Sequence, residues 1–111
     1  MFNTDTHGPW TVVHAGGEID VATADEFRAT LLDSLQRGEM VPIDFTEVTF
    51  MDSSGISVIV AGLKRTRDQG GSLVLVGLSE RLRVPLDLTG VSEIVDIRPS
   101  VAYLDVGRAA S

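Results

Sequence analysis

One short segment, residues 73–76 with the sequence Leu-Val-Leu-Val, most constrains the fold. Its four apolar side chains follow one another without the alternation of a strand that has one face in water. Both faces of such a strand must be covered, which is typical of an interior strand with parallel neighbours. The segment therefore favours an α/β fold with a buried, largely parallel sheet.

Strand and helix patterns alternate along the rest of the chain. Strands are predicted at residues 10–15, 41–45, 73–76 and 94–97, and residues 1–8 form a short edge strand or fray. Helices are predicted from 23 to 38, from about 53 to 68, over 79–90, and as a final turn within 100–106. This order predicts one α/β domain over residues 1–111, with a tail at 107–111. Helices would pack on a mixed, largely parallel sheet of four or five strands.

Capping residues and apolar spacing define the expected elements. Thr23 followed by Glu26 has the spacing of a capping box, and Gly38 ends that helix. The preceding strand closes at Gly16-Gly17, and the strand at 41–45 leads into a polar loop. The first helix has Ala24, Phe27, Leu31 and Leu35 at helical spacing. The second is predicted to face inward with Ile56, Ile59, Val60 and Leu63, and the third contains Leu82, Leu86 and Leu88.

Charge and composition exclude several classes of function. Sixteen acidic against nine basic residues give a net charge of -7, and the one basic cluster, Lys64, Arg65 and Arg67, lies near a helix end. Nucleic-acid binding is therefore not expected, whereas an acidic surface suits a basic partner or simply aids solubility. Without cysteine there is no disulfide, thiol catalysis or cysteine-bound metal. No secretion signal and no apolar run of ~20 residues appears, which predicts a cytoplasmic protein with no membrane role.

The run Asp52-Ser53-Ser54-Gly55 places two hydroxyls where a loop becomes an apolar helix. On local sequence alone it indicates a helix start, because aspartate and serine are preferred caps. A serine at that place is also accessible, and the helix dipole there favours negative charge. A phosphoryl group on Ser53 would be tolerated and would change the charge of an acidic surface. The two interpretations are compatible.

Three aspartates follow predicted strands. The segment containing Asp20 forms a turn before a helix, yet sites in open α/β sheets gather at the carboxyl ends of strands. Asp20, Asp44 and Asp52, with Gly55, are therefore expected to rim a partner or phosphate site next to Ser53. The carboxylates would orient the serine or assist a magnesium ion in a partner's active site. No spacing fixes three ligands, so no metal or other cofactor of the chain's own is predicted.

A small hydrolase or phosphotransferase that uses Asp52 or Ser53 is the alternative from another class. The two histidines, His7 and His14, lie in a tail and a strand, and no Gly-x-Ser-x-Gly elbow is present. No phosphate-binding glycine loop or dinucleotide fingerprint appears either. The chain is therefore predicted not to be an enzyme.

Four stretches, in order and with compatible spacing, carry a resemblance to a known family. They are residues 16–20 (Gly-Gly-Glu-Ile-Asp) with Thr23, residues 44–55, residues 70–76, and residues 88–91 (Leu-Thr-Gly-Val). Together they resemble the STAS domain and, within it, the anti-sigma factor antagonists of bacterial partner-switching systems. The likeness covers nearly the whole chain, and residues 44–55 are its most specific part.

The resemblance implies a charge switch. Such proteins bind an anti-sigma factor that is also a serine kinase of the histidine-kinase-like ATPase fold, and binding frees the sigma factor. The kinase inactivates them by phosphorylating the serine that matches Ser53, with Ser54 as an alternative acceptor. A metal-dependent serine phosphatase reverses the modification. Asp20 matches the family's early acidic residue.

Two prolines depart from the family pattern. Pro42 marks a strand start or a bulge, and Pro85 kinks or shortens the third helix. Neither falls in the phosphoacceptor loop, so they bear on which partner is accepted more than on the chemistry. The runner-up function is a STAS subunit of a stress-signalling scaffold or of a lipid-transport complex.

Overall fold

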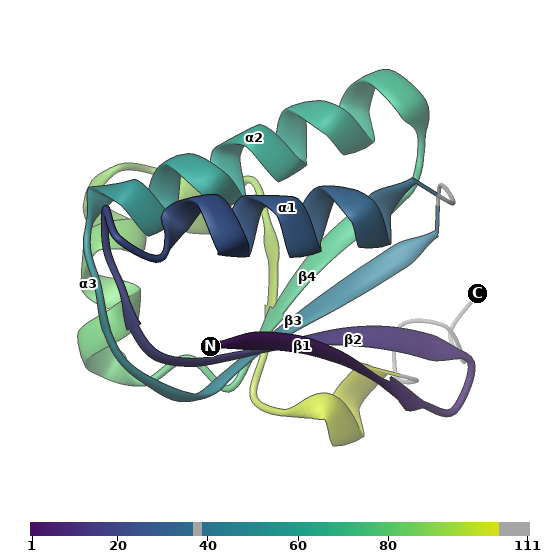
Figure 1. Ribbon diagram of the computed structural model, residues 1–111, viewed down its shortest axis with the longest axis horizontal. Coiled ribbons are helices and arrows are strands. Elements are labelled where there is room, and N and C mark those ends of the chain that lie inside the picture. Colours follow the sequence, from purple (N-terminus) through teal and green to yellow (C-terminus); the bar gives the residue numbers. More distant parts are fainter. Residues whose placement is uncertain (37–38, 105–111) are drawn as a thin grey trace.

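A mixed five-stranded sheet forms the centre of the computed structural model, which describes residues 1–36 and 39–104 (Figure 1). The elements in chain order are β1 (Phe2–His7), β2 (Trp10–Ile19), α1 (Ala24–Leu35), β3 (Met40–Met51), α2 (Ser53–Gln69), β4 (Ser72–Val76), α3 (Glu80–Leu88), the 3-10 helix η1 (Val91–Glu93), β5 (Asp96–Arg98) and the 3-10 helix η2 (Val101–Tyr103). Three predictions fall outside the described residues: the helix end at Gly38, the last part of the final turn at residues 105–106, and the tail at 107–111.

The strands follow the order β1-β2-β3-β4-β5. The edge strand β1 is antiparallel to β2, and all other neighbours are parallel, which confirms the mixed, largely parallel sheet. Residues 1–8 thus supply an edge strand. β4 lies between β3 and β5, and all of residues 73–76 are buried, as their double-sided apolar pattern predicted.

Helices α1 and α2 lie side by side on one face of the sheet (Figure 1). Phe27 of α1 is fully buried there, stacked on Phe2 with ring centroids 5.0 Å apart and edge-on to Phe45 at 6.3 Å. Close approach of α2 depends on Gly62, where an added Cβ would come within 2.9 Å of Leu31 Cδ2. This interlocked aromatic and aliphatic layer is the main core.

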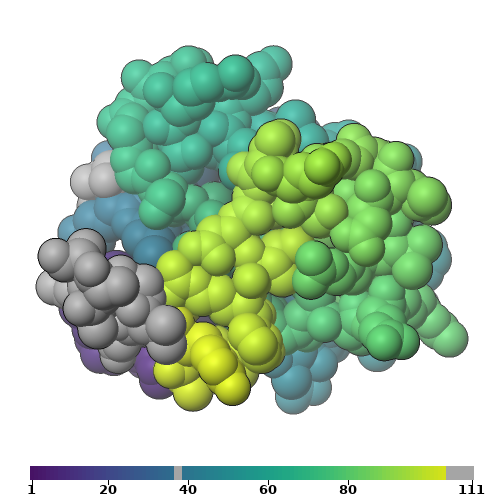
Figure 2. Space-filling view, turned by 180° about the vertical axis from the view of Figure 1, so that it is seen from behind, coloured from purple at the N-terminus to yellow at the C-terminus, as the bar shows by residue number. Residues whose placement is uncertain are grey.

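A smaller apolar cluster covers the opposite face. Leu104 is 1% exposed and packs with Val12, Val74 and Val76 beneath η2. Arg98 holds this segment, because its Nη1 donates to the carbonyls of Tyr103 and Leu104, both at 2.9 Å. Figure 2 shows the run from α3 through β5 to η2 (green to yellow) crossing this side of the molecule. Both faces of β4 are therefore covered.

β2 and β3 are longer than the sequence predicted. The expected strands ended at residues 15 and 45, but the two pair as far as Ile19 and Met51. β3 advances one residue more than β2 at each of two register shifts, so it carries two bulges. The helix-facing residues of β3 are spaced by three as a result: Phe45, Val48 and Met51. Because of this spacing, the sequence of β3 after Phe45 lacks the alternation of apolar and polar residues by which a strand is recognised.

Several helix predictions also need correction. The Thr23 side chain makes no cap hydrogen bond to α1, so the predicted capping box is wrong. In α2 the predicted stripe does face the core: Ile59 is buried, and Ile56, Val60 and Leu63 pack against the core while partly buried. The sequence did not predict the burial of Gly55, Val58 and Gly62. In α3, Leu82 and Leu86 are buried, whereas Leu88 is 82% exposed.

The prolines and the last strand lie close to their predicted places. Pro42 is the third residue of β3 and precedes the first pair that β3 makes with β2, which fits a strand start. Pro85 lies inside α3, a helix of nine residues capped by Ser79. β5 covers residues 96–98 instead of 94–97, and Ile94 is 68% exposed in front of it.

The aromatic contacts of Phe27 give a first prediction. Phe27→Ala removes a fully buried ring and should lower the free energy of unfolding by about 3–5 kcal/mol, measured by urea denaturation. Arg28→Ala, which changes the exposed neighbour on the same helix, should stay within about 0.5 kcal/mol of wild type. Equal midpoints for the two variants would contradict this description of the core.

Candidate functional site

Ser53 is the first residue of α2 and is exposed at the carboxyl edge of β3. Asp52 is the N-cap, and its Oδ1 accepts a hydrogen bond from the Ser54 N–H at 2.8 Å. The backbone carbonyl of Asp52 accepts from Gly55 and Ile56, which starts the helix. The serine side chain is therefore presented at a defined place, because the residue before it supplies the cap.

The start of α2 is fixed to the end of β2. Ile19 is paired with Met51, and the Ile19 carbonyl accepts a hydrogen bond from the Asp52 N–H at 3.1 Å. Asp20, the next residue, therefore lies beside Asp52 and Ser53. This bond places the backbone of Asp20 next to that of Asp52, the residue before Ser53.

Gly55 is buried and packs beneath the site. An added Cβ would lie 2.6 Å from Met51 Cγ and 2.8 Å from Ile19 Cγ2, distances that side chains do not tolerate. The sequence placed Gly55 on the rim, but its contacts show that it lets the first turn of α2 sit directly on the ends of β2 and β3. Gly55 thereby sets the height of Ser53 above the sheet.

A hydrogen-bonded turn carries Asp20 from β2 into α1. Asp20 Oδ1 accepts from the Ala22 N–H at 2.9 Å, and the Asp20 carbonyl accepts from Thr23 and Ala24. The Thr23 hydroxyl bonds both Glu18 and Asp20. The spacing of Thr23 and Glu26 predicts a cap for this hydroxyl, although Thr three residues after Asp is also the spacing of such a turn.

Asp44 lies elsewhere. It precedes Asp52 by eight residues of β3, roughly 25 Å at ~3.3 Å per residue of extended chain. Its carboxylate accepts from the Thr46 N–H at 2.9 Å and lies 3.3 Å from His14 Nδ1. The structure therefore does not bring Asp44 to Ser53, because β3 continues well past the residue at which the sequence ended it.

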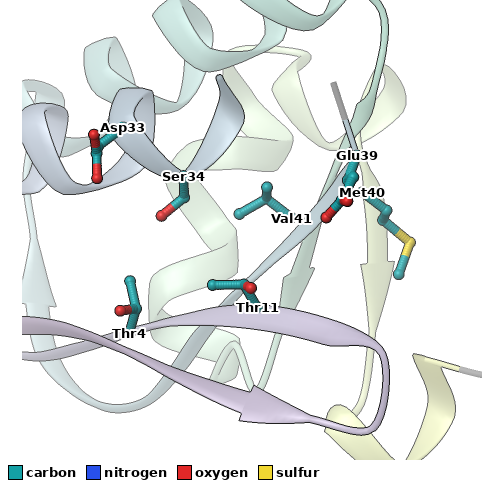
Figure 3. Close-up of a pocket in the computed structure, with 7 residues that line it drawn as sticks. All are labelled: Thr4, Thr11, Asp33, Ser34, Glu39, Met40 and Val41. Atoms are coloured by element: carbon teal, nitrogen blue, oxygen red, sulfur yellow. The ribbon is translucent and has the colours of Figure 1, made fainter. Parts of the chain in front are cut away.

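A hollow in the surface lies away from Ser53. A cavity of about 150 Å³ opens between the end of α1, the start of β3 and the β1–β2 hairpin (Figure 3). Its lining includes Asp33, Ser34 and Met40, at the opposite edge of the parallel strands from Ser53. This hollow is therefore separate from the Ser53 region.

Within residues 1–36 and 39–104, no group of three or more His, Asp or Glu side chains is arranged to hold a metal ion. In the same part of the chain no helix is long and apolar enough to cross a membrane.

Two exposed apolar side chains flank the site. Val21, next to Asp20, is 81% exposed, and Phe50, two residues before Asp52, is 47% exposed. Sequence reasoning did not single out either one, since exposure depends on how β2 and β3 end. They give the rim an apolar component beside its carboxylates.

The close packing of Gly55 leads to a second prediction. Gly55→Ala should lower the free energy of unfolding by about 1–3 kcal/mol, because the methyl group forces Met51 and Ile19 apart from α2. Gly16→Ala is the matched control: the nearest atom to its added Cβ is 3.6 Å away, so its stability should stay near wild type. Urea denaturation measures both variants. A Gly55→Ala variant with the wild-type free energy of unfolding would contradict the close packing of α2 on Met51 and Ile19.

Comparison with known proteins places this site in a family. Residues 1–104 match the family model of the STAS domain. The chain is 42% identical over 85 residues to a protein named anti-sigma-B factor antagonist from Bacillus subtilis (strain 168), covering 77% of this chain and 78% of that one. It is 39% identical over 87 residues to a protein of the same name from Listeria monocytogenes serovar 1/2a (strain ATCC BAA-679 / EGD-e), covering 78% and 76%.

Solved structures share the fold. An anti-sigma-factor antagonist (STAS) domain protein from Planctomyces limnophilus superimposes with a TM-score of 0.83 at 20% identity, over 96% of this chain and 95% of that one. The Bacillus cell fate determinant SpoIIAA in its phosphorylated form does so with a TM-score of 0.70 at 18% identity, over 98% and 99%. With the sequence matches, these findings show that the chain belongs to the STAS-domain family of anti-sigma factor antagonists, regulatory proteins that are not enzymes.

Proposed function

We propose that this protein is an anti-sigma factor antagonist controlled by phosphorylation of Ser53. Its unphosphorylated form would bind an anti-sigma factor that is a serine kinase of the histidine-kinase-like ATPase fold, and so free the sigma factor. The observation that carries the proposal is the exposed Ser53 at the first position of α2, beside Asp20 and Asp52. The relatives named anti-sigma-B factor antagonists support the role, and phosphorylated SpoIIAA supports the chemistry.

Ser53 is the better acceptor of the two serines. Ser53 is exposed, whereas Ser54 is half-buried and its N–H is held by the Asp52 carboxylate. A kinase must bring the γ-phosphorus of ATP within contact distance of the hydroxyl, which favours the exposed side chain. Ser54 is therefore the secondary acceptor in this proposal.

The transfer itself needs no catalytic group from this chain. Ser53 Oγ forms a bond to the γ-phosphorus while the bond from that phosphorus to the β,γ-bridging oxygen breaks, and ADP leaves with the electron pair. The hydroxyl proton passes to a base of the kinase. Positioning and charge stabilisation supply most of the catalysis in such reactions, and the kinase and its magnesium ion provide them. The antagonist contributes a rigid acceptor.

Asp20 and Asp52 would have different tasks. The Asp52 carboxylate is engaged in the helix cap, so it fixes the acceptor. Asp20 lies on a separate turn next to it, where its carboxylate would meet a cation of the partner, either a basic side chain or the magnesium ion on the nucleotide. Recognition of the partner would then depend on Asp20, and the position of the Ser53 hydroxyl would depend on Asp52.

Phosphorylation would act on the interface and not on the fold. It adds about -1.5 to -2 charges to a chain whose net charge is already -7. The dipole of α2 offsets about 0.3–1 kcal/mol of that change, so the domain stays folded. Against the phosphates of a bound nucleotide and the acidic rim, a loss of ~3 kcal/mol would weaken binding about a hundredfold.

The remaining parts of the cycle follow from the same proposal. A metal-dependent serine phosphatase would restore the hydroxyl, and the exchange would take place in the cytoplasm without nucleic acid or membrane contact by this chain. The acidic surface is consistent with a protein partner, because nucleic acid would repel it.

The test is phosphorylation in vitro by the histidine-kinase-like ATPases encoded in the same genome. Mass spectrometry after incubation with ATP should place one phosphate on Ser53. Ser53→Ala should abolish it, whereas Ser54→Ala should retain it. Ser53→Asp should weaken kinase binding only in part, because aspartate carries less charge and fewer acceptor oxygens than a phosphate. Binding is measured by calorimetry.

Two outcomes would count against the proposal. If no kinase from that genome modifies or binds the wild-type protein, the partner-switching role is lost. If Ser53→Asp binds the kinase as tightly as wild type, charge is not the switch. Ser57→Ala is the matched control, since Ser57 is also exposed on α2, one turn further on, and donates to the Ser53 carbonyl at 2.9 Å.

A further inference from the structure

We propose that Thr23 is a positioning residue, whose hydroxyl holds the Asp20 carboxylate in place for the partner kinase. The inference rests on the function proposed above and goes beyond it, because it assigns a role to a side chain outside the rim. Thr23 is half-buried. It acts through Asp20 and touches neither Ser53 nor a nucleotide.

One hydroxyl spans the whole turn between β2 and α1. Thr23 Oγ1 accepts a hydrogen bond from the Asp20 N–H at 3.0 Å and donates to the Glu18 carbonyl at 3.0 Å. These bonds tie the end of β2 to the residue that follows it. Because the donor and the acceptor lie on either side of Ile19, the bonds fix the direction in which the chain leaves the sheet.

The hydroxyl is not needed to start the helix. No side-chain cap bond from Thr23 to α1 exists, and the N–H groups of Thr23 and Ala24 donate instead to the Asp20 carbonyl at 3.1 and 2.8 Å. The hydroxyl of Thr23 therefore stabilises the turn between β2 and α1. Helix capping does not account for it.

What the turn holds is Asp20. Its N–H is bound by Thr23, its Oδ1 accepts from the Ala22 N–H at 2.9 Å, and the residue before it is joined to Asp52 through the Ile19 carbonyl. The carboxylate is thus fixed relative to the start of α2, although it comes from a separate segment of the chain. Loss of the Thr23 hydroxyl would leave Asp20 held only by its own turn.

The expected effect is on the rate of phosphorylation. Thr23→Val keeps the shape and removes the hydrogen bonds of the hydroxyl to Asp20 and Glu18. It should reduce kcat/KM of Ser53 phosphorylation about tenfold, which corresponds to the net contribution of roughly one hydrogen bond. Thr23→Ser restores the hydroxyl and should stay within about twofold of wild type. Thr66→Val is the matched control, because it removes a threonine bond to the Leu63 carbonyl at the far end of α2.

The decisive comparison uses Asp20→Asn. If Thr23 acts through Asp20, adding Thr23→Val to Asp20→Asn should change kcat/KM by less than about twofold. A purely structural role predicts the same tenfold loss in both backgrounds, and that result would overturn the inference. Thermal melts of every variant identify any loss of fold, and Thr23→Ala, which also lacks the hydroxyl, supplies the test if Thr23→Val does not fold.

Amide hydrogen exchange separates this inference from the proposed function. In Thr23→Val the Asp20 amide should exchange faster, whereas the Asp52 amide, bound to Ile19, should keep its wild-type rate. An unchanged exchange rate of the Asp20 amide would overturn the positioning role of Thr23. Failure of every kinase to phosphorylate the wild-type protein would overturn the proposed function and with it the role of Asp20, even if the exchange data agree.

Discussion

A single backbone hydrogen bond, from the Asp52 N–H to the Ile19 carbonyl, joins the two segments on which the site depends. This bond extends the parallel pairing of β2 and β3 by one residue. Beyond it, the β3 segment continues as α2 and the β2 segment continues as the turn that contains Asp20. Gly55 can approach this junction only because it lacks a side chain. The site is therefore an outcome of sheet pairing, and its residues need no direct contact with one another.

The same junction explains why the surface suits a switch based on charge. The first turn of α2 contains no acidic residue, and the Asp52 carboxylate is used in the cap. A phosphate on Ser53 would therefore lie at a helix N-terminus with no carboxylate inside that turn to oppose it. Repulsion would arise outside the turn, at Asp20 and across the interface. In the proposed switch, stability and binding would thereby be separated, since the fold would tolerate the charge that a partner would reject.

The sequence predicts the parts of this fold whose patterns are local. The doubly apolar run of β4 places it inside the sheet, and the Asp-Ser-Ser-Gly run places the start of α2 at residue 53. The ends of β2 and β3 escape such patterns. Two bulges shift the apolar period of β3 from two to three, so the strand looks like a loop after Phe45. Asp44 was placed in the site for that reason, although it lies mid-strand beside His14.

The role of Thr23 shows a second limit of sequence reasoning. Thr followed by Glu three residues later is a capping box in sequence, yet the helix takes its acceptor from the Asp20 backbone. Which acceptor prevails depends on where β2 ends, because only a strand that reaches Ile19 brings the Glu18 carbonyl within reach of the hydroxyl. The choice is set by long-range pairing, so no local window of sequence contains it.

These placements divide the site between two segments with separate constraints. The α2 segment is held by a cap and a buried glycine, so changes at Asp52 or Gly55 would disturb the acceptor itself. In the β2–α1 turn, by contrast, backbone and Thr23 bonds hold the chain while Val21 projects into solvent at 81% exposure. A side chain there can change without moving Ser53, because none of the bonds that fix the serine involves it. If Ser53 is the phosphoacceptor, as proposed, the turn is the part of the surface where the choice of partner would vary independently of it, because the sheet determines the position of Ser53.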